Sequence, residues 1–119
     1  MNYYEHTIII RQDLSLKQIE SLQEKYTSLI KKHKGSIAKI ENWGLINMAY
    51  EIKQNRKGNY LHFKLEGNTN TIQELEKNEK IDKNILRFLT IKVKKLNLDK
   101  NYFEIKKQEQ TINNKVTKI

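Results

Sequence analysis

The sequence has 119 residues, which is the length of one domain with a short extension. Its formal net charge of +9 at pH 7 favours a polyanionic partner such as nucleic acid, because counterion release provides affinity without special geometry. The chain has no cysteine, which excludes disulfides and thiolate metal sites, and no apolar stretch approaches the ~20 residues that a membrane-spanning helix needs.

The first part of the chain predicts a strand followed by a helix. Residues 3–11 are aromatic and β-branched, as strands are. Ser15 and Gln18 then match a capping box at a helix start. An apolar stripe follows at helical spacing: Leu16, Ile19, Leu22, Tyr26, Leu29 and Ile30. We expect Gly35 to end this helix in a left-handed conformation.

The middle of the chain predicts a hairpin. Residues 36–52 have strand character throughout, and an uninterrupted strand of that length would span roughly 55 Å. We therefore expect Gly44 to mark a bulge that bends it. A basic turn over residues 53–58 reverses the chain, and residues 59–66 predict the third strand.

A second helix is predicted from about residue 70, with Thr71 and Glu74 as its capping box. Residues 85–94 predict the last strand, and residues 95–119 a polar, flexible tail that holds one apolar cluster of Tyr102, Phe103 and Ile105. The order strand, helix, strand, strand, helix, strand favours a single α+β domain over residues 1–94. This is a ferredoxin-like βαββαβ sandwich, a four-stranded antiparallel sheet with two helices on one face.

The sheet face without helices is predicted to be apolar. Alternation places Tyr60 and His62 opposite the core-facing residues of their strand, and Leu89 and Ile91 opposite Phe88. An exposed apolar patch marks a partner site. A strand register shifted by one residue would exchange the two faces and remove the patch.

Other uses of this architecture match poorly. Residues 57–63, KGNYLHF, begin like an RNA-recognition signature, but Asn59 and Leu61 stand where stacking aromatics are needed. Residues 11–18 lack the glycine of a phosphate-cradling acylphosphatase loop. The three histidines, His6, His33 and His62, do not have the spacing of metal ligands. No nucleophilic side chain has a general base at a spacing that would pair the two. We therefore expect no enzymatic activity, no cofactor and no metal.

Several blocks resemble the bacterial-type small-subunit ribosomal protein six family over residues 1–94. They are MNYYE, WGLINMAYEI with the basic turn and YLHFKLEG after it, and NILRFLTIK. Glu51 departs from the family, which usually has proline there. The resemblance implies a non-enzymatic protein of a bacterial or organellar type of ribosome, in the cytoplasm in the bacterial case. It also implies binding to the central domain of small-subunit RNA together with ribosomal protein eighteen, as a heterodimer that builds the platform.

The resemblance also implies which residues make the contacts. The positions matched to RNA contacts are Asn2, Tyr4, Lys80 and Arg87, where cations would hold phosphates. The turn cations are further RNA candidates, although a solvated hairpin tip would look the same: Lys53, Arg56 and Lys57. The partner-facing residues would be Tyr60, His62, Leu89 and Ile91, with the strand edge at residues 45–50 open to main-chain pairing.

The alternative function is a small-ligand regulatory domain of the same architecture that dimerises through its sheet. Such domains place glycines at a strand–helix junction so that the ligand can approach the backbone. The first junction here, residues 11–16, has none.

Overall fold

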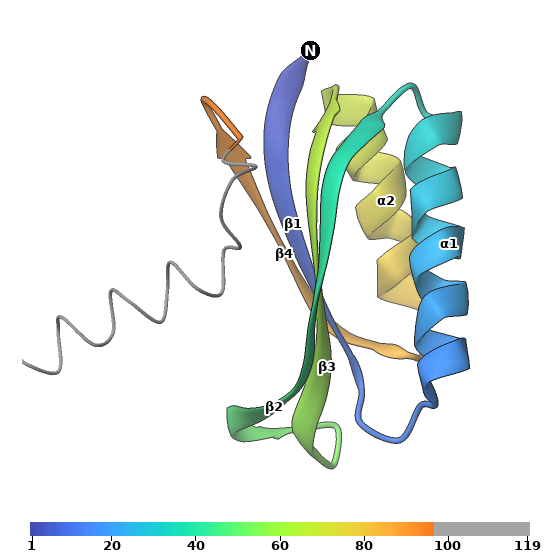
Figure 1. Cartoon of the computed structure of the whole chain (residues 1–119), viewed down its shortest axis with the longest axis vertical. Helices are drawn as coiled ribbons and strands as arrows, with labels where there is room; N and C mark the ends of the chain where they lie inside the picture. Colours follow the sequence, from blue (N-terminus) through green and yellow to red (C-terminus); the bar gives the residue numbers. More distant parts are fainter. Residues whose placement is uncertain (97–119) are drawn as a thin grey trace, which may run out of the picture.

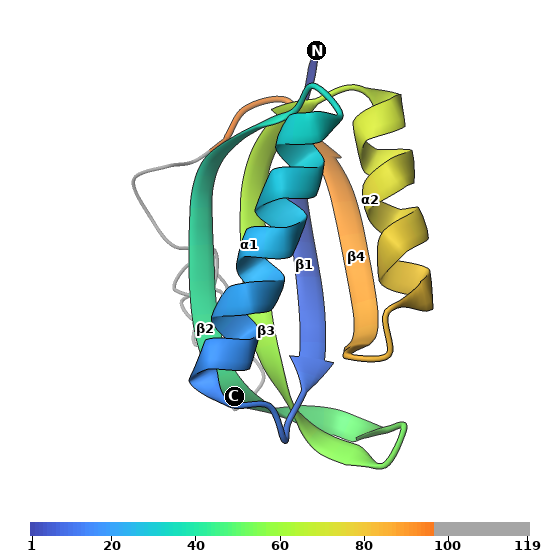
Figure 2. The same cartoon turned by 90° about the vertical axis from the view of Figure 1, so that its right-hand side faces the viewer.

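The computed structural model describes residues 1–96. The elements are β1 (Asn2–Arg11), α1 (Leu16–Lys32), β2 (Ser36–Ile52), β3 (Asn55–Gly67), α2 (Thr69–Ile81) and β4 (Ile85–Val93). The strands form one antiparallel sheet in the order β2-β3-β1-β4, and both helices cover the same face (Figures 1 and 2). The predicted ferredoxin-like sandwich is confirmed. Within residues 1–96, no helix is long and apolar enough to cross a membrane.

The predicted division into a domain and a tail stays a prediction. The structure describes the chain only as far as Leu96, two residues beyond the expected domain end. The apolar cluster of Tyr102, Phe103 and Ile105 lies outside the described residues.

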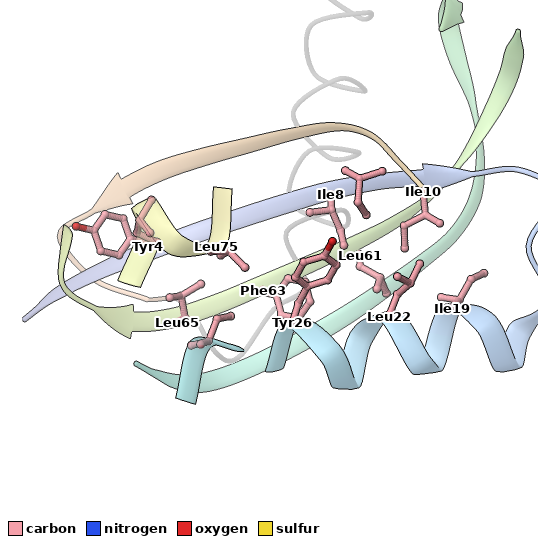
Figure 3. Close-up of a cluster of buried hydrophobic side chains, with 13 residues drawn as sticks. Tyr4, Ile8, Ile10, Ile19, Leu22, Tyr26, Leu61, Phe63, Leu65 and Leu75 are labelled. Carbon is pink, nitrogen blue, oxygen red and sulfur yellow. The ribbon is translucent and has the colours of Figure 1, made fainter. Parts of the chain in front are cut away.

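The core lies between the helices and the face of the sheet that they cover (Figure 3). Its buried side chains come from five of the elements, and Ile37 and Ile40 of β2 are partly buried against them. The buried set is Tyr4, Ile8, Ile10, Ile19, Leu22, Tyr26, Ile30, Leu61, Phe63, Leu65, Ile72, Leu75 and Ile85. Ile8 pairs with Leu61 on one side and with Phe88 on the other, so all three share the inner face. The predicted faces of the strands are therefore right, and the one-residue shift is excluded.

One polar pair is buried in this core. His6 is fully buried, with Nε2 2.7 Å from the Glu79 carboxylate and Nδ1 2.6 Å from the Thr90 hydroxyl. Burial raises the pKa of Glu79, and the hydrogen bond with His6 acts in the opposite direction. His6 is thus a packing residue, and both of its ring nitrogens have partners.

Helix α1 begins as the sequence predicts. The Ser15 hydroxyl accepts a hydrogen bond from the Gln18 N–H at 3.3 Å, and the Gln18 side chain accepts one from the Ser15 N–H at 2.8 Å. The capping box is confirmed.

The end of α1 differs from the prediction by one residue. Lys34, not Gly35, takes the left-handed conformation, with φ 66°. The N–H of Gly35 bonds to the Ile30 carbonyl and that of Lys34 to the Lys31 carbonyl, the two bonds of a Schellman motif. Gly35 is small for another reason, because a Cβ there would lie 2.7 Å from Ile30 Cγ2 and 2.8 Å from Thr71 Cγ2.

The predicted capping box of the second helix is wrong. Asn68 caps α2: its side chain accepts from the Thr71 N–H at 2.9 Å, and the Thr71 hydroxyl accepts from the Asn68 N–H at 3.2 Å. Thr71 is therefore the third helical residue rather than the cap, and Glu74 has no capping role. The Thr71 hydroxyl also lies 2.6 Å from the His33 carbonyl oxygen, which joins the end of α1 to the start of α2.

The turn between β2 and β3 is shorter than predicted. Only Lys53 and Gln54 form it, with φ values of 45° and 66°, as in the two-residue turns that match strand twist. β3 therefore begins at Asn55, and Arg56 and Lys57 lie on this strand rather than in a loop. The turn projects past the rest of the sheet (Figure 1).

Candidate interaction surface

The sheet face without helices, called here the open face, carries exposed apolar side chains. On β4, Leu89 is 59% exposed and Ile91 is 42% exposed. A hollow of about 390 Å³, called here the open-face hollow, lies over the middle of this face. Its lining includes Glu5, Trp43, Tyr60, Arg87, Leu89 and Ile91.

Trp43 reaches the open face because of a bulge. The pairing of β2 with β3 shifts between Asn42 and Gly44, which confirms the predicted bulge, and Gly44 has φ 77°. The Asn42 side chain accepts from the Gly44 N–H at 2.8 Å and holds the bend. The indole ring then stacks on His62, with centroids 4.9 Å apart, and on Tyr60, with centroids 6.1 Å apart.

An ion pair is buried on the same side of the sheet. Glu41 Oε2 lies 3.1 Å from Lys64 Nζ, and the two side chains are 2% and 1% exposed. The Trp43 N–H donates to the other Glu41 oxygen at 3.0 Å. Because charges removed from water need partners, this arrangement fixes the indole and the ion pair to one another.

His62 is buried next to this pair. Its Nδ1 is 2.7 Å from the Thr7 hydroxyl oxygen, and its Nε2 is 3.5 Å from a Glu5 oxygen. Burial lowers the pKa of His62 below its ordinary value of 6.5, although the carboxylates of Glu5 and Glu41 act to raise it. We conclude that the imidazole is neutral at pH 7.

Arg87 closes one end of the open-face hollow. Its Nη1 donates to the Tyr50 hydroxyl at 2.8 Å, and its guanidinium carbon lies 5.3 Å from the Tyr50 ring centroid, within cation–π range. Tyr50 lies near the end of β2, so this contact ties the projecting hairpin to β4.

The predicted RNA contacts do not form one surface. Asn2 begins β1, whereas Arg87 pairs with Ile9, which is seven positions and roughly 23 Å further along the strand. Lys80 is exposed in the last turn of α2, which leads to the start of β4. The RNA roles of Asn2, Lys80 and Arg87 stay predictions.

The structure corrects the predicted RNA contact of Tyr4. It is only 7% exposed and belongs to the core, and its hydroxyl accepts a 3.4 Å hydrogen bond from the Asn2 side chain. Its ring is therefore not available for RNA. The cations Lys53, Arg56 and Lys57 are exposed at the hairpin end, and their roles stay predictions.

The predicted partner face is exposed or partly exposed at every residue except His62. Leu89 and Ile91 are exposed and Tyr60 is partly exposed, but His62 is 2% exposed beneath Trp43 and cannot touch a partner directly. Trp43 covers His62 on the open face, and the sequence pattern indicated no role for it. Its place just before the predicted bulge was the available signal, since bulges redirect side chains.

Known proteins are similar to this chain both in sequence and in fold. The family described as Ribosomal protein S6 matches residues 3–92. The small ribosomal subunit protein bS6 of Pelagibacter ubique is 56% identical over 106 residues, covering 89% of this chain and 88% of that protein. Its counterpart in Rickettsia felis is 39% identical over 119 residues, covering 100% and 97%. The crystal structure of 30S ribosomal protein S6 from Thermotoga maritima has a TM-score of 0.74 at 27% identity and covers 94% of this chain and 97% of its own. The chain therefore belongs to the ribosomal protein S6 family, the structural, non-enzymatic proteins of the small ribosomal subunit.

Proposed function

We propose that this chain binds the central domain of small-subunit ribosomal RNA together with ribosomal protein eighteen, as a heterodimer that helps to build the platform. The observation that carries the proposal is the open face, where Leu89 and Ile91 are exposed beside the aromatic rings of Trp43 and Tyr60. Apolar and aromatic side chains of this kind mark protein interfaces on an otherwise polar surface.

The edges of the sheet support the protein contact. β2 and β4 are its outer strands, so each has one side that no strand of residues 1–96 pairs with. A partner segment can add to such an edge through main-chain hydrogen bonds. Glu51 is exposed on β2, at the position where the family usually has proline, so this chain keeps a main-chain N–H there that proline would lack.

The RNA contact is assigned to the hairpin end of the molecule. Four exposed cations belong there, on the β2–β3 turn, the start of β3 and the last turn of α2: Lys53, Arg56, Lys57 and Lys80. Such cations bind phosphates and position the protein without reading sequence. Asn2, at the other end of β1, is a separate proposed contact.

The protein contact is tested with one substitution and a matched control. Leu89→Asp places a charge on the open face, and Leu16→Asp makes the same change at a side chain that is 65% exposed on α1. We expect Leu89→Asp to weaken the affinity for purified ribosomal protein eighteen by about 100-fold, measured by calorimetry. A loss of this size is typical of substitutions at the centre of an interface. Leu16→Asp should have no effect. Equal affinities for both variants would refute the contact.

The RNA contact is tested by salt and by charge. The variant Lys53→Gln, Arg56→Gln, Lys57→Gln is compared with the control Lys17→Gln, Lys31→Gln, Lys32→Gln, whose cations are exposed on α1. The measurement is the slope of the logarithm of the binding constant, for the heterodimer and a central-domain RNA fragment, against the logarithm of the salt concentration. This slope should become less steep by about 2 in the first variant. If both variants change the slope equally, the hairpin end is not the specific contact.

A further inference from the structure

We propose that the open-face hollow receives one segment of the partner polypeptide, with a large apolar side chain between a basic and an acidic residue. The basic residue lies at the Glu5 end and the acidic residue at the Arg87 end. This inference rests on the proposed heterodimer and specifies which part of the partner enters this chain.

The two ends of the hollow carry opposite charges. Glu5 pairs with Ile91 across the sheet, and Ile9 pairs with Arg87. Glu5 and Arg87 therefore lie four strand positions apart, about 13 Å along β1. Two residues four apart in an extended partner segment span the same distance, so one such segment satisfies both ends.

The middle of the hollow suits an apolar side chain. Leu89 lies on the β4 side, and the rings of Trp43 and Tyr60 lie on the other, around a volume of about 390 Å³. Tryptophan, tyrosine and arginine are the residues that contribute most to binding energy at protein interfaces, and all three line this hollow.

Trp43 is already fixed before the partner arrives. Its N–H is bonded to Glu41 at 3.0 Å, and its ring is stacked on His62 at 4.9 Å. Binding to a preorganised ring avoids the entropy cost of ordering it. Glu41, through this hydrogen bond, is a positioning residue for the contact.

The charges of the hollow favour a polypeptide over RNA. Among the lining residues, all within the described part of the chain, Arg87 is the only lysine or arginine. A phosphate at the other end would meet the Glu5 carboxylate. Like charges at close range suppress the wrong partner.

Trp43 is the only tryptophan of the chain, so its emission reports directly on the hollow. We would titrate the 119-residue chain with ribosomal protein eighteen in which any tryptophan has been replaced by phenylalanine. The proposal predicts a saturable blue shift of the Trp43 emission. Arg87→Glu should weaken binding at least tenfold and Glu5→Gln severalfold. Lys17→Glu, which changes an exposed lysine of α1 outside the hollow, should have no effect. Circular dichroism would check that each variant is folded.

The outcomes separate this inference from the proposed function. The heterodimer could form and be disrupted by Leu89→Asp while the Trp43 emission does not shift and neither Arg87→Glu nor Glu5→Gln weakens binding. That result overturns the inference and leaves the proposed function standing. If no heterodimer forms, the proposed function itself fails. If the emission shifts when the concentration of this chain is raised without the partner, and sedimentation shows dimers, the hollow is occupied by a second copy of the chain. A shift caused by the RNA fragment alone would assign it to RNA, and either result overturns the inference.

Discussion

The ion pair buried under the open face, Glu41 with Lys64, predicts a large response to Lys64→Met. Lys64 lies on β3, with Nζ 3.1 Å from Glu41 Oε2 and its side chain 1% exposed. Methionine occupies much of the space of the lysine stem but carries no charge. The substitution therefore leaves the Glu41 carboxylate buried without this cation.

The expected magnitude follows from the contacts that remain. Removing one partner of a buried ion pair costs about 3–5 kcal/mol of the free energy of unfolding. The hydrogen bond from the Trp43 N–H to Glu41, at 3.0 Å, survives the substitution and stabilises the remaining charge. We therefore expect the lower end, about 3 kcal/mol, which corresponds to a fall in Tm of roughly 10–20 °C for a domain of this size.

The assay is urea unfolding followed by circular dichroism in a double-mutant cycle. Glu41→Gln keeps an acceptor for the Trp43 N–H while it removes the charge, so the double variant Glu41→Gln, Lys64→Met should recover to within about 1 kcal/mol of the parent. The reasoning is refuted if Lys64→Met costs less than about 1 kcal/mol. It is also refuted if the double variant is as unstable as the sum of the two single variants.

Three further predictions concern the helix end, the glycines and pH. Lys34→Gly should raise the free energy of unfolding by about 1 kcal/mol, because φ 66° strains any residue with a Cβ. A urea midpoint that does not rise would contradict the Schellman ending. Gly35→Ala should cost about 1–3 kcal/mol through the clash with Ile30, more than Gly44→Ala, where a Cβ meets nothing within 4 Å and only the φ of 77° opposes it. The pKa of His62 is lowered by burial, so the native state binds fewer protons than the unfolded state near pH 6.5. The stability that His62 contributes should be present above pH 6.5 and be lost as the pH falls through its folded pKa. Urea midpoints between pH 5 and 8 should show this slope in the parent and less of it in His62→Gln, and identical slopes would disprove it.

The sequence by itself determined the order of the elements and which face of each strand is buried. These features depend on signals that act within a few residues, such as the apolar stripe of α1, the capping box of Ser15 and Gln18, and the alternation along β3. The end of α1 shows the precision of such signals: glycine indicated the stop, but the left-handed residue is the lysine before it.

Only the tertiary structure decided the environment of the open face. Alternation places Lys64 opposite the core, where a lysine is expected to meet water, yet it is buried with Glu41, a residue of another strand. Arg87 and Tyr50 are 37 positions apart and meet only because the hairpin bends across the sheet. Bulges, strand pairing and twist set these distances together, and a local pattern of residues records none of them.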